Sequence, residues 1–315
     1  MDVHRSAAGV AVRAPAKLNL FFEVLGKRSD GFHEIETLMV PVNLFDDLHF
    51  QPDATGRISV ECRWAGLDEP GTSRGDLPAE AENIATRALQ LLRRRAGLTA
   101  GARVQLLKRI PSAAGLGGGS SDAAAALLAG NAGWQLNWPR RALLPLAAEL
   151  GSDVPFFLAR SAAVCRGRGE RIEPVDGLGC LDFVLVRPPA GLSTARVYAN
   201  CRAAQPPQPL EPLVRALAKG DRRLAGRLLY NRLEEAAEPL SPWIGRLKAE
   251  FARLDCPARM SGSGSSYFGM CRGARHARRV AARLRSRGVG RVYAVHSCGR
   301  RHLGGSQGSF GSRRE

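Results

Sequence analysis

The segment that most restricts the fold lies between a strand-like run, residues 104–107, and an alanine-rich stretch that follows Asp122. Four glycines fall within residues 115–119, and two serines precede Asp122. Glycine permits positive φ and lets a ligand approach the backbone closely. The first amides of a helix have no partner within the helix and carry the positive end of its dipole. The pattern therefore predicts a strand, a glycine loop and a helix whose N-terminus binds phosphate.

This loop differs from two familiar phosphate-binding sequences. It lacks the Gly-Lys-Ser/Thr ending of a Walker A loop. Its glycines also do not give G-x-G-x-x-G with an acidic residue about 20 positions later. A simpler interpretation is a tight turn before a helix that Ser120 or Ser121 caps. We favour phosphate binding, because the glycines are dense and two hydroxyls lie at the helix start.

Composition indicates a globular protein of the cytoplasm. Hydrophobic residues make up 44% of the 315 residues, enough for a packed core. No apolar run approaches the ~18–20 residues that span a bilayer, and the N-terminus has no apolar segment typical of a secretory signal. The seven cysteines are odd in number and form no C-x-x-C pair, so neither a disulfide framework nor a zinc site is expected. A reducing compartment without a membrane partner fits best.

The net charge of +17 raises the alternative of nucleic-acid binding. Only five of the 46 basic residues are lysine, which suggests a GC-biased coding sequence. The basic excess is also localised, because twelve arginines fall in residues 272–315. Residues 274–287 have the apolar spacing of a surface helix, without the interleaved aromatic residues that single-strand binding favours. We interpret this charge as a solvated face. Residues 300–315 are predicted to form a basic disordered tail.

Hydrophobic spacing predicts an α+β protein. Strands are expected at residues 10–12, 18–25, 37–42, 47–50, 57–63, 103–108, 181–187, 267–271 and 291–297, with a hairpin at 162–175. Helices are expected at residues 81–95, 120–131, 140–150, 211–218, 222–228, 242–254 and 274–287. The β-α-β-α-β order of the second half suggests a ferredoxin-like sandwich. A turn at 175–179 divides the chain into predicted domains 1–178 and 179–299, before the tail 300–315.

Four motifs together resemble a known family. Residues 111–123, P-x-x-x-G-L-G-G-G-S-S-D-A, resemble the second motif of the GHMP kinases, which include galactokinase and the homoserine, mevalonate and phosphomevalonate kinases. Residues 14–20 with 30–33 (APAKLNL and DGFH), 150–157 (LGSDVPFF) and 260–266 (MSGSGSS) complete the resemblance. The N-terminal pair and residues 150–157 resemble the branch that phosphorylates 4-diphosphocytidyl-2-C-methylerythritol in the non-mevalonate isoprenoid pathway. Ala113 and Ala114 stand where that branch often has glycine.

The resemblance implies an ATP-dependent small-molecule kinase with the two-domain GHMP kinase fold. Its N-terminal domain would be ribosomal-protein-like and its C-terminal domain ferredoxin-like, with ATP and a cytidine-diphosphate polyol in the cleft between them. It also implies that Asp153 is the general base and Lys17 its partner. From the residues alone, Asp153 is equally compatible with a cap of the segment that starts near Pro155, and Lys17 with a side chain that reaches solvent.

The glycine loop is expected to hold the ATP phosphates, with Mg²⁺ bound to them. Either Ser120 or Ser121 can offer the ion a hydroxyl, and Ser121 is the predicted metal ligand. Plain capping of the helix by these serines is the alternative. The predicted cofactor-binding residues are Pro111, Ser112, Ala113, Ala114, Gly115, Leu116, Gly117, Gly118, Gly119, Ser120 and Ser121.

Recognition of the cytidine substrate is assigned through the same resemblance. It places Phe32 and His33 against the cytosine with Asn19 nearby, and Tyr198 would complete a stack with Phe32. A lone histidine is more often structural, and Ala195 replaces the proline that the family has before Tyr198. The remaining predicted substrate contacts, which would close over phosphate from the second domain, are Gly262 and Ser263.

Three alternatives stay open. The chain is compatible with another GHMP kinase, although homoserine and mevalonate derivatives have no base to stack. It is also compatible with a basic nucleic-acid-binding protein, whose binding would weaken steeply with salt and would not need Asp153. A catalytically silent GHMP scaffold is disfavoured because Lys17, Asp153 and the glycine loop are all present. We expect a monomer or a weak homodimer.

Overall fold

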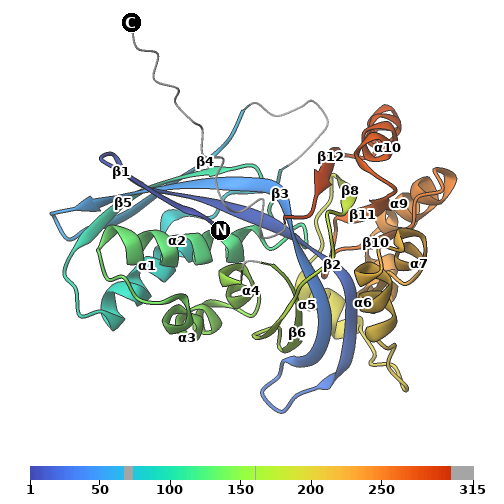
Figure 1. Ribbon diagram of the computed structural model, residues 1–315, viewed down its shortest axis with the longest axis horizontal. Coiled ribbons are helices and arrows are strands. Elements are labelled where there is room, and N and C mark those ends of the chain that lie inside the picture. Colours follow the sequence, from blue (N-terminus) through green and yellow to red (C-terminus); the bar gives the residue numbers. More distant parts are fainter. Residues whose placement is uncertain (67–73, 160, 299–315) are drawn as a thin grey trace, which may run out of the picture.

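The structure is a computed structural model, and it describes residues 1–66, 74–159 and 161–298. Two sheets organise it: an eight-stranded sheet built mainly from the first half of the chain, and a four-stranded sheet from the second half (Figure 1). Helices pack on both, so the predicted α+β class is confirmed. Among the described residues, no helix combines the length and hydrophobicity needed to cross a membrane.

The larger sheet is mostly antiparallel. Its main path runs β1 (Val3–Ser6), β2 (Gly9–Lys27), β3 (His33–Asp53), β5 (Gly101–Lys108) and β4 (Ile58–Trp64). Two further strands extend it from β3, namely β6 (Ala162–Gly167) and then β7 (Arg171–Val175), while β9 (Tyr230–Asn231) pairs with β2. Among the described strands of this sheet, the β4–β5 and β2–β9 pairs are parallel and the others antiparallel.

The hairpin of β2 and β3 carries two of the sequence motifs. The sequence predicted two short strands in place of each of these long ones, which is wrong. Pro15 has no amide hydrogen to donate, but a register shift between Pro15 and Ala16 absorbs the interruption. Further shifts near Asn19 and Val24 bend the hairpin, and its far end curves toward the C-terminal half (Figure 1).

Helices cover one face of the larger sheet (Figure 1). They are α1 (Ile84–Arg95), α2 (Gly118–Gly133), α3 (Arg140–Leu150) and α4 (Val154–Leu158), with a short 3₁₀ turn, η1 (Glu80–Glu82), before α1. The alanines at positions 123–126 of α2 are fully buried, because small side chains let this helix lie close to the sheet. Gly133 shows how close: a Cβ there would come within 2.2 Å of the Phe50 ring.

The smaller sheet is entirely antiparallel in the order β10 (Ala258–Met260), β11 (Tyr267–Cys271), β8 (Asp182–Arg187) and β12 (Arg291–His296). Between β8 and β10 the chain forms α5 (Thr194–Asn200), α6 (Glu211–Ala218), α7 (Arg222–Arg227), α8 (Leu233–Ala237), η2 (Glu238–Leu240) and α9 (Pro242–Arg253). Helix α10 (Ala274–Ser286) connects β11 to β12. This strand order is ferredoxin-like, as predicted.

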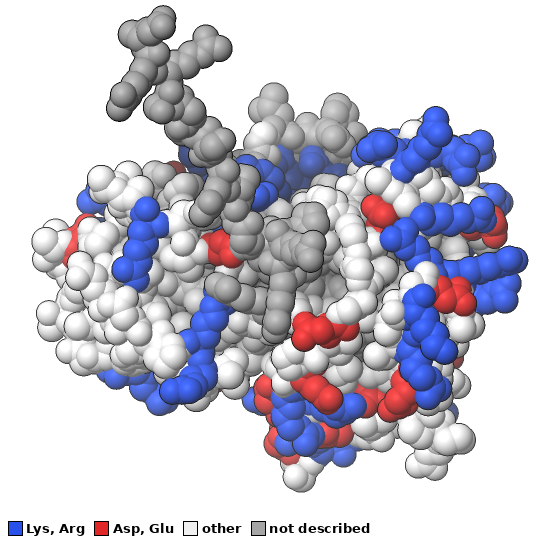
Figure 2. All heavy atoms as spheres, viewed as in Figure 1, with Lys and Arg blue, Asp and Glu red and all other residues white. Residues whose placement is uncertain are grey.

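Basic side chains are concentrated over the C-terminal elements. Figure 2 shows Lys and Arg gathered on the side of the molecule where α7, α9 and α10 lie. In α10 the apolar side chains at Val280, Ala281 and Leu284 are buried, as the sequence predicted.

The two halves of the chain are joined by more than one segment. Strand β9 lies in the C-terminal half but pairs with β2 of the larger sheet. The predicted domain limits 1–178 and 179–299 therefore stay predictions, although the chain does pass from one sheet to the other between β7 and β8. The predicted tail 300–315 lies outside the described residues.

Candidate active site

The glycine loop joins β5 to α2 through left-handed backbone at Gly115 (φ 71°) and Gly117 (φ 69°). Only glycine adopts this conformation without steric cost. The loop borders a cavity of about 300 Å³ that residues 110–120 line together with Lys108 and Ile84. No side chain caps the start of α2, so the alternative of a serine cap is wrong. The uncapped helix start instead borders open space that an anion can fill.

Ser120 and Ser121 lie in different environments. The Ser121 side chain is fully buried, and its Oγ donates a hydrogen bond of 2.7 Å to the Pro15 carbonyl oxygen. Ser120 borders the loop cavity and a second, larger one. The hydroxyl that is open to a ligand is therefore that of Ser120, and the metal-ligand role of Ser121 stays an untested prediction.

Lys17 and Asp153 meet at the loop. Lys17 lies on β2, where its backbone amide donates to the Leu116 carbonyl oxygen at 2.9 Å. Its Nζ lies 3.5 Å from Oδ2 of Asp153, which immediately precedes α4. The Lys17 side chain is 4% exposed and that of Asp153 is 32% exposed. Asp153 makes no capping hydrogen bond to α4, so the capping interpretation of this carboxylate is wrong.

The Asn19 side chain contacts the ammonium group of Lys17. Its Oδ1 accepts a hydrogen bond from the Lys17 ammonium, and its Nδ2 donates to Thr37 Oγ1 at 2.8 Å. Thr37 in turn donates to the Phe21 carbonyl oxygen at 2.6 Å. Asn19 is 1% exposed and does not line either cavity. The predicted direct contact with cytosine stays untested, and the observed contacts are with the Lys17 ammonium and with β3.

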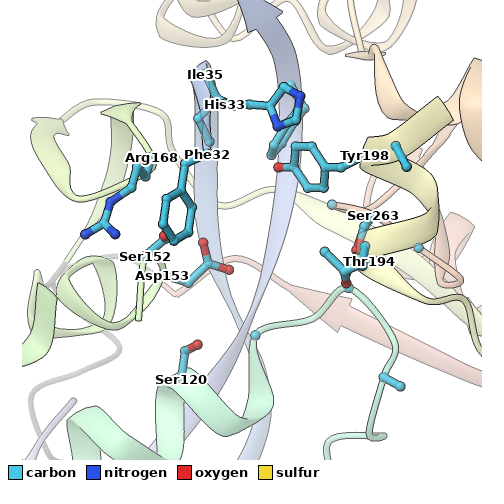
Figure 3. A pocket seen from close by; sticks show the side chains of 18 of the residues that line it. Phe32, His33, Ile35, Ser120, Ser152, Asp153, Arg168, Thr194, Tyr198 and Ser263 are labelled. Atoms are coloured by element: carbon cyan, nitrogen blue, oxygen red, sulfur yellow. Dashed lines mark hydrogen bonds between the residues drawn. The ribbon is translucent and has the colours of Figure 1, made fainter. Parts of the chain in front are cut away.

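A cleft of about 850 Å³ lies in front of Lys17 and Asp153. It shares four lining residues with the loop cavity, so the two spaces adjoin along the glycine loop. In Figure 3, Asp153 and Phe32 lie on one side, Tyr198 and Thr194 on the other, and Ser120 below. The predicted site residues that line this cleft are Lys17, Phe32, His33, Ala113, Gly115, Gly117, Ser120, Asp153, Tyr198, Gly262 and Ser263.

Aromatic side chains line the end of the cleft away from the loop. Phe32 is 48% exposed, and the Arg168 guanidinium lies over its ring, 4.6 Å from the centroid. The His33 and Tyr198 rings lie 5.0 Å apart and tilted by 32°. Burial, with the charge of Lys27, lowers the pKa of His33. Burial raises the pKa of the Tyr198 hydroxyl, so both rings are neutral at neutral pH.

The loop of residues 261–266 closes the cleft from the second sheet. Ser261 Oγ donates to the Gly115 carbonyl oxygen at 3.1 Å, and the Ser266 amide donates to that of Ala114 at 3.2 Å. Ser263 Oγ lies 2.8 Å from Thr194 Oγ1. These contacts tie the glycine loop to the C-terminal half, so neither loop can shift without disturbing the other.

A buried cluster of charged side chains lies next to the glycine loop. The Lys108 ammonium pairs with the carboxylates of Asp46 and Asp122, and the other oxygen of Asp46 accepts from the amides of Arg109 and Ile110. Burial raises the pKa of Asp122. Two carboxylates and one ammonium carry a net negative charge, so the buried cluster favours an additional proton.

Sequence reasoning missed several lining residues. Arg168 lies in the turn between β6 and β7, where the flanking glycines marked a hairpin but nothing indicated which way its arginine points. Thr194 starts α5, a helix that the sequence did not predict. Lys27 is at the end of β2, beyond the recognised motif. Lys17, Lys27 and Arg168 face the cleft with a single lining carboxylate, Asp153, so the cleft suits an anionic ligand.

Comparison with known proteins gives consistent matches. The family model described as GHMP kinases N terminal domain matches residues 83–161, and that described as GHMP kinases C terminal matches residues 213–290. The 4-diphosphocytidyl-2-C-methyl-D-erythritol kinase of Pelotomaculum thermopropionicum is 43% identical over 279 residues, covering 88% of this chain and 94% of the relative. The enzyme of the same name from Thermobifida fusca is 40% identical over 289 residues, covering 89% and 92%.

Solved structures agree with these matches. A crystal structure of 4-(cytidine 5'-diphospho)-2C-methyl-D-erythritol kinase superposes with a TM-score of 0.75 at 37% identity, covering 92% of this chain and 99% of that one. The homoserine kinase from Cytophaga hutchinsonii superposes with a TM-score of 0.71 at 20% identity, covering 95% and 98%. At that identity the second likeness concerns the fold alone.

Proposed function

Because the chain belongs to the GHMP kinases, and within them to the 4-diphosphocytidyl-2-C-methyl-D-erythritol kinases, we propose that it phosphorylates the 2-hydroxyl of 4-diphosphocytidyl-2-C-methyl-D-erythritol with ATP. The matches to the family models and to the relatives confirm the family resemblance that the four sequence motifs indicated. The reaction serves isoprenoid precursor synthesis by the non-mevalonate route, and we place it in the cytoplasm.

The observation that carries this proposal is that two cavities adjoin at the glycine loop, and that Lys17 and Asp153 line the larger of them. The loop cavity offers an uncapped helix N-terminus for phosphates, and the larger cleft offers aromatic side chains for a base. Lys17 lies next to Gly117, which lines both cavities, since a Cβ on Gly117 would come within 3.0 Å of Lys17 Cγ. A phosphate donor and an alcohol acceptor placed in the two spaces would meet beside Lys17 and Asp153.

In the proposed step, the 2-hydroxyl oxygen forms a bond to the γ-phosphorus of ATP. The bond from that phosphorus to the β,γ-bridging oxygen breaks, and ADP leaves. The hydroxyl proton passes to the Asp153 carboxylate, which acts as general base. The Lys17 ammonium, 3.5 Å from that carboxylate, stabilises negative charge on the hydroxyl oxygen as the proton leaves.

The lining residues fit Mg²⁺ only as an ion held largely by phosphate. The described residues contain no group of three His, Cys, Asp or Glu side chains that could hold a metal. Mg²⁺ commonly keeps several waters and binds substrate phosphates plus one or two protein oxygens. Ser120 and Asp153 both border the cleft, and Ser120, rather than the buried Ser121, would offer the ion a hydroxyl. When bound, the ion neutralises charge on the phosphates.

Cytosine would bind at the aromatic end of the cleft. Arg168 lies over the Phe32 ring, which leaves the other face of that ring for stacking with a base. Tyr198 lies across the cleft from Phe32 (Figure 3). The neutral His33 ring carries one donor and one acceptor, which suits the edge of a cytosine. Asn19 would act as a positioning residue that aims the Lys17 ammonium.

The test measures ADP release with ATP and Mg²⁺ against a panel of alcohols. The panel contains 4-diphosphocytidyl-2-C-methyl-D-erythritol, the same polyol without its cytidine, homoserine and mevalonate. We expect turnover only with the first compound and a loss of about 10²–10⁴-fold in kcat for Asp153→Asn. Glu61→Gln, an exposed carboxylate on β4, is the matched control and should retain full activity.

Other outcomes would identify the alternatives. Turnover with homoserine or mevalonate instead would indicate another GHMP kinase. Absence of turnover with every alcohol would contradict the kinase proposal and leave the scaffold and nucleic-acid alternatives. Full activity of Asp153→Asn would exclude this carboxylate as the base while leaving the substrate assignment intact.

A further inference from the structure

A second cavity, of about 560 Å³, lies in the C-terminal half between α7, β11 and the start of α10. Its volume falls within the ~300–1,000 Å³ typical of small-molecule sites. None of its lining residues lines the active-site cleft. We call it the arginine cavity, and its charged lining residues and histidine are Arg222, Arg223, Arg227, Asp255, Arg272 and His276.

The charges around the arginine cavity are unbalanced. Its single lining carboxylate, Asp255, already pairs with Arg272 at 2.6 Å. Arg222 donates to the carbonyl oxygens of Arg272 and Cys180 at 2.9 and 2.8 Å and lies 3.9 Å from the Asp182 carboxylate, so its guanidinium is held beside the cavity and its charge is already paired. Within the described part of the chain, Arg223 and Arg227 have no hydrogen-bond or ion-pair partner. Guanidinium groups that share one cavity repel each other, and a bound anion relieves this repulsion.

Helix α10 adds a further attraction for an anion. This helix has 13 residues, no side chain caps its start at Gly273, and its first turn holds no acidic residue. The positive end of its dipole therefore lies at the cavity uncompensated. His276, in the first turn, accepts a hydrogen bond at Nδ1 from the Arg272 amide at 3.2 Å. The proton of its neutral ring is consequently on Nε2, which is a donor.

We propose that the arginine cavity binds a small molecule that carries a diphosphate group, at a site separate from the active-site cleft. Guanidinium groups bind phosphate oxygens in pairs through parallel N–H bonds. Arg223 and Arg227, the two unpaired guanidinium groups, both lie on α7, and each can serve one of two linked phosphates. The lining includes no Phe, Tyr or Trp side chain, so the cavity lacks the large aromatic surfaces on which nucleic-acid bases stack. This proposal does not depend on the kinase reaction.

Free diphosphate and the diphosphate of an ester present the same charged group. The experiment therefore titrates the full chain by isothermal calorimetry with inorganic diphosphate in one arm and a short alkyl diphosphate in the other. The test variant is Arg223→Ala with Arg227→Ala. The matched control removes the same charge from exposed positions of α10, Arg278→Ala with Arg283→Ala. Kinase turnover without added diphosphate should stay unchanged in both, which shows that the variants are folded.

In the test variant we expect the Kd of one diphosphate-binding event to rise by about tenfold or more, because charge-assisted hydrogen bonds are lost. In the control the same Kd should rise by less than about twofold, because the removed charges lie outside the cavity. Any binding of the added diphosphate at the glycine loop of the active site should persist in both variants. A stronger response to one arm identifies free or esterified diphosphate as the preferred form. Equal weakening in both variants, or none in either, would overturn the proposal. The proposal would also be overturned if a single-stranded oligonucleotide displaced the bound diphosphate with an affinity that increased with oligonucleotide length.

Discussion

Substitution of Gly115 by alanine tests whether the contact between the two loops organises the active site. Gly115 has a left-handed φ of 71°. A Cβ at this position would lie 2.1 Å from the Ser261 carbonyl oxygen and 3.1 Å from backbone atoms of Gly264. Both neighbours are backbone, so no side-chain rotation can relieve the clash. The glycine loop and the 261–266 loop must separate.

The size of the effect follows from these contacts. Alanine in a left-handed conformation costs about 1–2 kcal/mol. The loops must also part by about 1 Å to reach ordinary van der Waals separation. That movement weakens the two hydrogen bonds that join them, from Ser261 Oγ to Gly115 and from the Ser266 amide to Ala114, each worth about 0.5–1.5 kcal/mol. The free energy of unfolding should therefore fall by about 2–5 kcal/mol.

The assay combines urea unfolding with steady-state kinetics. Misplacement of the loop by about 1 Å should lower kcat/KM for ATP by about 10²-fold. Gly119→Ala is the matched control for the unfolding measurement alone, because its Cβ would meet only the Ile84 Cγ2 at 3.6 Å, an ordinary contact. Alanine at this helical position should raise the free energy of unfolding by about 0.5–1 kcal/mol.

A Gly115→Ala protein with a free energy of unfolding within about 0.5 kcal/mol of the original, the range of neutral surface changes, would refute this reasoning. Such a result would mean that the two loops are already apart in solution. Destabilisation without any change in kcat/KM would show instead that the contact is structural and does not align the phosphate site.

Three further predictions concern the surroundings of the site. Because burial raises the pKa of Asp122, the folded state holds this proton more tightly than the unfolded chain, so this group's contribution to stability declines as pH rises above about 4. Asp122→Asn removes that decline, so the free energy of unfolding of the variant should increase relative to that of the original protein as pH rises. A difference between the two free energies that does not change with pH would contradict the raised pKa of Asp122. Arg168→Ala should raise KM for the cytidine substrate by about 2–30-fold, the value of a cation–π contact with Phe32, with KM for ATP unchanged; equal changes in both KM values would argue against a base-specific role. Asn231→Ala removes a buried amide that donates to the carbonyl oxygens of Met260 and Gly262 at 2.7 and 2.8 Å, and thermal unfolding should show a loss of about 2–4 kcal/mol; a neutral result would mean that water replaces the amide.

The local elements were predictable because their signals are local. Helix α3 spans the predicted residues 140–150, and the glycine loop leads into a helix as its composition indicates. Backbone conformation at Gly115 and Gly117 follows from residue type within a few positions. The pairing of Lys17 with Asp153, by contrast, was inferred only through the family resemblance, since nothing near either residue encodes the other.

By itself, then, the sequence determined most of the helices and their order, the ferredoxin-like second half and the residue types at the phosphate loop, all of which depend on short-range periodicity and steric preference. Only the tertiary structure decided which side chains meet. The register shift after Pro15 orients β2, so that Asn19 faces Lys17 and Thr37 rather than the cleft. Packing of the β6–β7 turn brings Arg168 onto Phe32. Such contacts join residues far apart in the chain, and they depend on strand register and on the fit of whole layers, which no local pattern contains.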